Sequence, residues 1–451
     1  MGQAERATAH GDETRRAARG RQRMLRALLM ALASLLTARA EAQDIERDPI
    51  RYSTATPRNA VATLQERLAS GKAKLVYEPK HGYLKSVLRA LDVPESSQIL
   101  VFSRTSLQRD RISPRTPRAI YFNDDVMVGY CNRGRVMEIS AADQTLGTAF
   151  YTIDQEPDDR PTITRQTDSC LLCHSSSANQ GLPGHLVRSV YVDLKGNPLL
   201  ANGSFRTDHT SPIAQRWGGW YVTGTSGRQK HMGNQICPKG RKPEALDNTQ
   251  GVNVVDLKDR FRTSMYLTPH SDIVALMVLE HQAGMLNRLA RAGMETRMAL
   301  YYQRELNKAL GQPLDEPSES AQSRIRSAGD DVVSYMLFSG ETRLTDPIVG
   351  TSKFAAEFAA RGPRDSKGRS LRDLDLRTRL FRYPCSYLIH SRAFDSLPPE
   401  MKSYIYGRLL EILTGRSSSK DDPQLDPADR AAIIEILRET KRDLPAEWHQ
   451  P

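Results

Sequence analysis

The sequence of 451 residues predicts an α+β fold, with strands in its first half and helices in its second. As far as residue 154 it holds short segments rich in β-branched and aromatic residues, separated by Pro, Gly, Asn and Asp, a pattern typical of strands and turns. From residue 271 onward apolar residues recur at intervals of three and four, which indicates amphipathic helices. We therefore predict a mixed α/β domain over residues 43–265 and an all-helical domain over residues 266–451.

The N-terminal segment has the layout of a secretory signal peptide. Residues 24–42 read MLRALLMALASLLTARAEA: a basic residue, an apolar run, and small residues around a cleavage site after Ala42. The apolar run is shorter than the roughly 20 residues that cross a bilayer. We predict a signal peptide over residues 1–42, with Met24 as an alternative start. The mature chain is then periplasmic or otherwise extracytoplasmic, and we expect no transmembrane segment in it.

The charge of the chain is basic. Four of its eleven net positive charges lie in residues 1–42, which leaves seven on the mature chain. This excess suits an acidic redox partner or an anionic membrane surface, although a solvated basic surface is the more common explanation of such a charge. We do not expect nucleic acid as a partner, because the chain is predicted to be exported and shows no recognition motif.

The elements of the first domain follow in order from these patterns. Apolar residues at helical spacing predict helices over residues 57–68 and 84–91, the first behind a Thr-Pro start signal. Period-two, β-branched segments then predict strands over residues 98–103, 118–123, 126–131, 136–140 and 147–154. Two further strands are expected around a turn at residues 193–198, and another at residues 217–224.

The second domain begins with a long helix. Residues 271–302 keep apolar positions three and four apart, and Ser271-Asp272 is a suitable cap. Further helices are predicted over residues 400–413 and 427–441. Polar linkers are predicted over residues 311–330, 361–372 and 414–429.

Two cysteines and a histidine lie within five positions in the stretch DSCLLCH, residues 168–174. A structural zinc site would need a second Cys or His pair at similar spacing, and the sequence has none. A redox dithiol would need the two cysteines but not the adjoining His174. Covalent haem attachment uses all three residues, because two thiols bind the porphyrin vinyl groups and the imidazole binds the iron.

The stretch SCLLCH resembles the haem-attachment motif of c-type cytochromes. The resemblance implies one covalent haem c, with Cys170 and Cys173 as thioether residues and His174 as the axial ligand. The segments PRAIYFNDDV, RWGGWYVTG and YPCSYLIHSRAFDSLPPE are similar to those of a group of uncharacterised secreted bacterial monohaem proteins. That similarity extends from about residue 60 to the end of the chain and implies no known activity.

The second axial ligand would determine what such a haem does. Met232, in KHMGN, follows His174 at the separation that small cytochromes use for their axial methionine, and a loop methionine packed on the core is the alternative. Three histidines compete with it: His231, His209 and His185. His281 and Met285 share one face of the long helix, where core packing is the simpler expectation.

Aromatic, basic and cysteine residues elsewhere in the sequence are candidates for other roles around a haem. Trp217, Trp220 and Tyr221 would line the haem or form a strand core. Arg206 and Arg216 would pair with propionates or be ordinary surface arginines. The spare cysteines, of which two could form a disulfide in an oxidising compartment, are Cys131, Cys237 and Cys385.

These expectations converge on a secreted monohaem c-type cytochrome that transfers single electrons to an unidentified redox partner protein. The chain is much longer than a simple carrier needs. The alternative is therefore a haem-dependent oxidoreductase, such as a peroxidase or oxidase, or a haem-based gas or redox sensor. Either alternative would need an open distal site on the iron.

Overall fold

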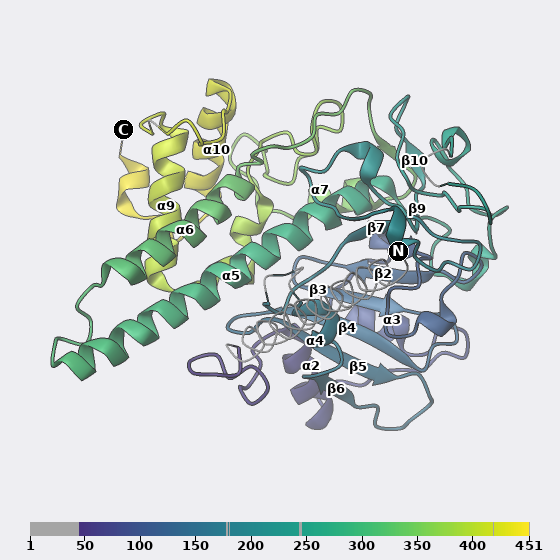
Figure 1. The fold of residues 1–451 in the computed structure, drawn as a ribbon, viewed down its shortest axis with the longest axis horizontal. Helices are drawn as coiled ribbons and strands as arrows, with labels where there is room; N and C mark the ends of the chain where they lie inside the picture. The colour runs from purple at the N-terminus through teal and green to yellow at the C-terminus, as the bar shows by residue number, and fades with distance from the viewer. Residues whose placement is uncertain (1–44, 177–178, 180, 243–245, 418, 451) are drawn as a thin grey trace, which may run out of the picture.

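The computed structural model describes residues 45–176, 179, 181–242, 246–417 and 419–450 (Figure 1). The predicted signal peptide, residues 1–42, lies outside the described residues. Within the described ranges, no helix combines the length and the apolar character needed to cross a membrane.

A seven-stranded antiparallel sheet forms the centre of the first half of the chain, in the order β6-β5-β4-β3-β2-β1-β9. Its strands are β1 Ile99–Val101, β2 Arg118–Phe122, β3 Val126–Tyr130, β4 Val136–Asp143, β5 Gly147–Asp154, β6 Ile163–Gln166 and β9 Trp220–Tyr221. Side chains alternate along β4 between buried and half-buried positions, because successive residues of a strand point to opposite faces.

The two faces of the sheet belong to different cores. On one face, Tyr121, Ile139 and Tyr151 pack with apolar residues of helices α2 Ala60–Ala69 and α3 Leu84–Ala90. On the other face, Phe122 joins the core built around helix α5, Ile273–Leu310. The sheet is therefore sandwiched between short helices on one side and the C-terminal helices on the other.

Helix α5, Ile273–Leu310, extends over 38 residues and runs across the molecule beside the sheet (Figure 1). Helix α6, Glu319–Met336, lies along it, and helix α9, Pro399–Leu413, packs against α6. The remaining helices are α4 Leu171–His174, α7 Phe354–Ala360, α8 Arg392–Asp395, α9 Pro399–Leu413 and α10 Pro427–Thr440. Short strand pairs complete the fold: β7 Arg188–Val190 with β8 Ser204–Arg206, and β10 Gly224–Thr225 with β11 Val349–Gly350.

The predicted α+β class is confirmed, with strands mainly in the first half and helices mainly in the second. The two-residue strand β11 lies in the helical region and pairs with β10 across the predicted boundary. One hydrophobic core also joins residues on both sides of that boundary, such as Trp220 and Leu276.

Three expectations are corrected. The predicted linker over residues 311–330 contains the first two-thirds of α6, because the buried face there consists largely of small residues. Around the predicted turn at residues 193–198 only Val192 and Pro198 form a bridge, and β7 pairs instead with β8 farther along the chain. The predicted strand over residues 217–224 is reduced to β9 and the start of β10, and residues 217–219 are not in a strand, since Trp217 and Gly219 adopt φ values of 68° and 81°.

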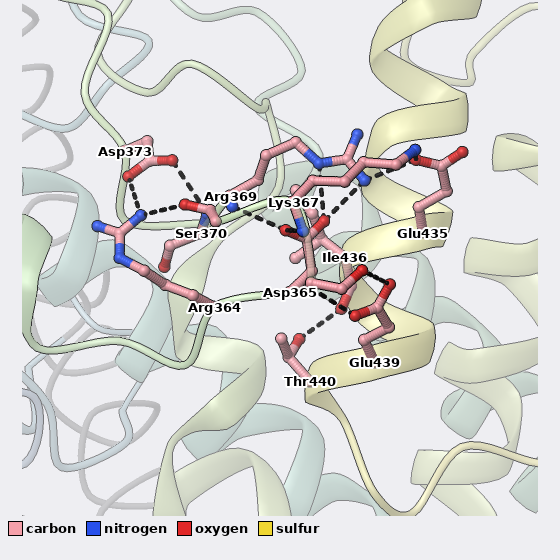
Figure 2. A network of polar contacts seen from close by, with 12 residues as sticks. Arg364, Asp365, Lys367, Arg369, Ser370, Asp373, Glu435, Ile436, Glu439 and Thr440 are labelled. Carbon is pink, nitrogen blue, oxygen red and sulfur yellow. Dashed lines mark hydrogen bonds and ion pairs between the residues drawn. The ribbon is translucent and has the colours of Figure 1, made fainter.

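An ionic network fixes the loop over residues 361–372 to helix α10 (Figure 2). Lys367 and Arg369 both reach the Glu435 carboxylate, at 2.7 and 2.6 Å. One turn later, Glu439 accepts hydrogen bonds from the backbone N–H and the hydroxyl of Ser366, at 2.6 and 2.9 Å. These polar contacts hold the loop against helix α10.

Candidate functional site

The CxxCH motif forms a single helical turn. Helix α4 comprises Leu171–His174, and its first hydrogen bond joins the His174 N–H to the Cys170 carbonyl at 3.0 Å. Cys170 and Cys173 are three positions apart and so lie on the same side of the turn. Both thiols are free, with Cys170 half-buried and Cys173 exposed, and Leu172 between them is 82% exposed. The turn therefore presents two unpaired sulfurs at the protein surface.

The imidazole of His174 has a fixed orientation. Its Nδ1 lies 2.9 Å from the carbonyl oxygen of Gly184. A carbonyl can only accept a hydrogen bond, so Nδ1 carries the proton and donates it. Burial lowers the pKa of His174 and so favours the neutral ring, whereas the hydrogen bond to Gly184 raises the pKa by a smaller amount. The lone pair is therefore on Nε2, the arrangement in which a histidine can bind a metal ion.

A second set of contacts holds the loop that follows the turn. The His174 carbonyl accepts hydrogen bonds from the Gly184 N–H and from Asn179 Nδ2, both at 3.0 Å. Asn287 on α5 binds His185 from both sides, accepting from its N–H and donating to its carbonyl, at 2.8 Å each. The orientation of His174 is thus supported by helix α5.

The sheet contributes residues to this site that the sequence does not suggest. The ring of Phe150 on β5 lies 4.8 Å from that of His174, measured between centroids. Arg118 on β2 and Glu138 on β4 form an ion pair. Burial raises the pKa of Cys170 to about 11, and the Glu138 charge raises it further while Arg118 opposes the shift. These charges also act on His174, so the ion pair lies beside the motif.

The expected distal ligands lie in different surroundings. Met232 is buried, and its Sδ accepts a hydrogen bond from the Ser189 hydroxyl at 3.6 Å. His231 is buried against Trp217 and accepts the Gly233 N–H on Nδ1 at 3.1 Å. These contacts engage the Sδ of Met232 and one ring nitrogen of His231.

The other two candidate distal histidines are His209 and His185. His209 Nδ1 lies 2.9 Å from Nδ1 of His281. Burial lowers the pKa of His185 to about 3, and the nearby charge of His174 lowers it further. No hydrogen-bond partner for His185 Nε2 is found among the described residues. His185 is therefore the distal candidate that is electrostatically coupled to the motif.

His281 belongs to a buried polar chain. Its Nε2 lies 2.8 Å from the Ser386 hydroxyl, and its Nδ1 meets His209. A serine that contacts a histidine, itself contacted by an orienting group, is the arrangement of a catalytic nucleophile and its base. Ser386 and His281 are both completely buried, so no substrate can reach them. The chain therefore joins α5 to neighbouring loops, and Met285 on the same helix face is also buried in the core.

The aromatic and basic candidates are divided between core and surface. Trp217 and Trp220 lie in the core around α5, while Tyr221 lies in the core on the opposite face of the sheet. Arg216 is not a surface arginine: it is 3% exposed and pairs with Glu280 at 3.3 Å. Arg206 is exposed on β8.

The spare cysteines are buried free thiols. Burial raises the pKa of Cys131 and of Cys385 to about 12, which makes both unreactive at neutral pH. The Cys237 thiol lies 3.2 Å from the Arg241 carbonyl. In the described part of the chain, no group of three or more His, Cys, Asp or Glu side chains is arranged to hold a metal ion.

Comparison of the chain with protein-family models, with curated proteins and with solved structures gives no match.

Proposed function

We propose that the protein is an exported monohaem c-type cytochrome that transfers single electrons. The observation that supports this most strongly is the combination of motif and geometry at residues 170–174. Two free thiols lie three residues apart on one turn, and the adjoining His174 is fixed through Nδ1 with Nε2 available. A redox dithiol requires the first feature but not the second.

The residues present fit a covalent haem. Cys170 and Cys173 would hold the porphyrin through thioether bonds, and His174 would bind the iron. The haem would supply an iron centre that accepts and releases one electron. The chain itself orients His174 through the Gly184 carbonyl, and such a hydrogen bond raises the basicity of the ligand. The neighbouring Arg118–Glu138 pair places one charge of each sign beside the site, so it adds little net field.

A haem enzyme or sensor with an open distal site is the second candidate. It is favoured by the surroundings of two expected distal ligands: Met232 Sδ accepts the Ser189 hydroxyl, and His231 Nδ1 accepts the Gly233 N–H, which leaves the proton of the neutral ring on Nε2. These side chains therefore have hydrogen-bond partners within the protein, and their positions are explained without a bond to the iron. The two candidates share the attachment site and differ only in the sixth coordination position.

Haem attachment is tested by mass spectrometry of the mature protein, produced in a host with cytochrome c maturation. We expect the mass of one haem above that of the polypeptide, retained after denaturation. The Cys170→Ser/Cys173→Ser variant should lose it, whereas Cys237→Ser, which changes a thiol outside the motif, should keep it. Recovery of the bare polypeptide mass from the wild type would refute the proposal.

The optical spectrum of the holoprotein distinguishes carrier from enzyme or sensor. A low-spin ferric spectrum with the charge-transfer band of methionine ligation, lost in Met232→Ala, would establish the carrier with Met232 as distal ligand. A low-spin spectrum changed in His185→Ala would transfer that role to His185. A high-spin spectrum that responds to cyanide or carbon monoxide would instead establish the open site.

A further inference from the structure

A cavity of about 510 Å³ lies between the loop that follows the CxxCH motif, the segment after β8, and helices α5 and α6. Its volume is in the range of small-molecule binding sites. Its charged lining consists of three arginines and two aspartates: Arg206, Arg288, Arg291, Asp208 and Asp331. The three guanidinium groups and two carboxylates give the lining a net charge of +1.

Arg288 is held rigidly at the cavity wall. Its guanidinium carbon lies 3.8 Å from the centroid of the Tyr335 ring, and its Nη1 donates to the Gly284 carbonyl at 3.3 Å. Its Nε donates to Asp331 at 3.2 Å. A guanidinium fixed by stacking loses little side-chain entropy when it binds an anion. Arg288 still has N–H groups beyond those used in these contacts, since the guanidinium carries five donors.

Arg291 is one turn farther along α5 and less constrained. Its Nη1 lies 4.0 Å from the Asp331 carboxylate, beyond hydrogen-bonding distance, and its side chain is 39% exposed. Asp208, on the other side of the cavity, is already engaged by the N–H and hydroxyl of Thr210, at 2.9 and 2.6 Å. Arg206 offsets the charge of Asp208, so the excess positive charge is on the side of α5, where Arg288 and Arg291 face one carboxylate, Asp331.

The inner wall of the cavity provides a polar atom and an apolar surface. His185 is 5% exposed, lines the cavity, and has no hydrogen-bond partner for its Nε2 among the described residues. Leu186, Val187 and Phe205 add apolar contact surface beside it. An oxyanion with a short apolar group matches this combination, because guanidinium groups pair with carboxylates and the apolar wall favours a carbon substituent.

We propose that this cavity binds a small organic anion, a monocarboxylate with a short apolar substituent. Arg288 and Arg291 bind the carboxylate, and the wall of Leu186, Val187 and Phe205 receives the substituent. A singly charged ligand is favoured over a phosphate ester because the lining carries a single excess positive charge. Arg288, Arg291 and the three apolar residues are outside the haem-attachment motif and are not candidate haem ligands, so the proposal does not require a bound haem. His185 alone is shared with the candidates for the distal ligand.

The proposal is tested by isothermal titration calorimetry of the purified mature protein with phenylacetate, and with phenylacetamide as its neutral isostere. We expect saturable binding of phenylacetate and at least tenfold weaker binding of phenylacetamide. Arg288→Gln should weaken phenylacetate binding at least tenfold. Arg291→Gln should weaken it several-fold without disturbing the fold, because that side chain has only a long ion pair with Asp331. Arg304→Gln is the matched control, since Arg304 also lies on α5 and pairs with Asp315 at 2.8 Å outside the cavity.

Each possible result of these titrations either supports or overturns the proposal. Saturable, charge-dependent binding that is weakened by both cavity variants and unchanged in Arg304→Gln supports the proposal. Absence of phenylacetate binding, equal affinity for phenylacetamide, or wild-type affinity in both cavity variants overturns it. Inorganic phosphate that binds as tightly as phenylacetate also overturns it, because the cavity would then be a site for simple ions only.

Discussion

At the scale of single residues, the most consequential contact is the buried ion pair between Arg216 and Glu280. The side chains are 3% and 0% exposed, and Arg216 also donates to the carbonyls of His209 and Ser211. Burial raises the pKa of Glu280 to about 7, although the Arg216 charge lowers it. The Arg216 charge is thus needed to keep the Glu280 carboxylate ionised in the core.

We predict that Arg216→Met lowers the free energy of unfolding by about 3–5 kcal/mol at pH 8, because it leaves a buried carboxylate without its partner. The loss should be smaller at pH 5, where Glu280 can be protonated in the folded protein. Urea unfolding at the two pH values measures both effects. Arg216→Met/Glu280→Gln is the control: if the double variant is as unstable as the single one at pH 8, charge burial is not the cause.

The residues of the candidate site show what the sequence can reveal at this scale. Cys170, Cys173 and His174 are neighbours in the chain, so their spacing alone identifies them. Phe150 and the Arg118–Glu138 pair reach the motif through the register of β2, β4 and β5. Such contacts depend on strand pairing across the sheet, and no local pattern near residue 170 encodes them.

At the scale of elements, the start of α5 is fixed by one carboxylate. Asp272 Oδ1 accepts the Val274 N–H at 2.8 Å and so caps the helix. Its Oδ2 accepts the N–H groups of Thr351 and Ser352, at 2.8 and 2.7 Å, and the Ser352 hydroxyl at 2.8 Å. Asp272 therefore caps the longest helix and binds the segment around β11 at the same time.

We predict that Asp272→Ala lowers the free energy of unfolding by about 4 kcal/mol, because it removes a cap and leaves the partly buried donors of Thr351 and Ser352 unpaired. Asp426→Ala is the matched control. Asp426 caps α10 through the Ala428 N–H at 2.8 Å but is exposed, so its loss should cost only about 1 kcal/mol. Urea unfolding measures both. Equal losses would show that the contacts to Thr351 and Ser352 contribute nothing.

The elements also show where sequence patterns succeed and fail. The long helix is predictable because Asp272 and an uninterrupted apolar period mark it over many turns. Helix α6 is not, because Ala321, Ala328 and Gly329 are buried there without a strong apolar signal. Gly329 packs against Tyr404 of α9, where a Cβ would lie 2.4 Å from the ring, so close helix packing replaces a large apolar face.

At the scale of the whole molecule, buried titratable groups determine how stability depends on pH. Burial lowers the pKa values of several histidines, to about 3 for His185 and His209 and to about 4 for His231 and His390, and well below normal for His281. Burial raises the pKa values of three carboxyls, to about 6 for Asp125 and to about 7 for Glu280 and Glu341.

The lowered pKa values of the histidines and the raised pKa values of the three carboxyls change the free energy of unfolding in opposite directions as the pH falls. Between pH 6.5 and the lowered pKa values, the unfolded chain binds protons that the folded histidines do not, so stability falls as the pH falls. The carboxyls with raised pKa values bind protons more tightly when folded. Their contribution is complete below about pH 4 and is lost as the pH rises through about 6 to 7. The histidines outnumber these three carboxyls. Below about pH 4 the contribution of the three carboxyls no longer changes, while carboxyls with lowered pKa values, such as Asp247 at about 2, lose their stabilising contribution together with the histidines.

We therefore predict that the free energy of unfolding falls by a few kcal/mol from pH 7 to pH 4, most steeply below about pH 4.5. Urea unfolding across this range measures the slope. His231→Asn should flatten it, since asparagine can still accept the Gly233 N–H but does not titrate. His449→Gln, which changes an exposed histidine, should leave the slope unchanged. A stability that rises toward pH 4 would mean that the three carboxyls, rather than the histidines, dominate, because only their protonation favours the folded state at low pH.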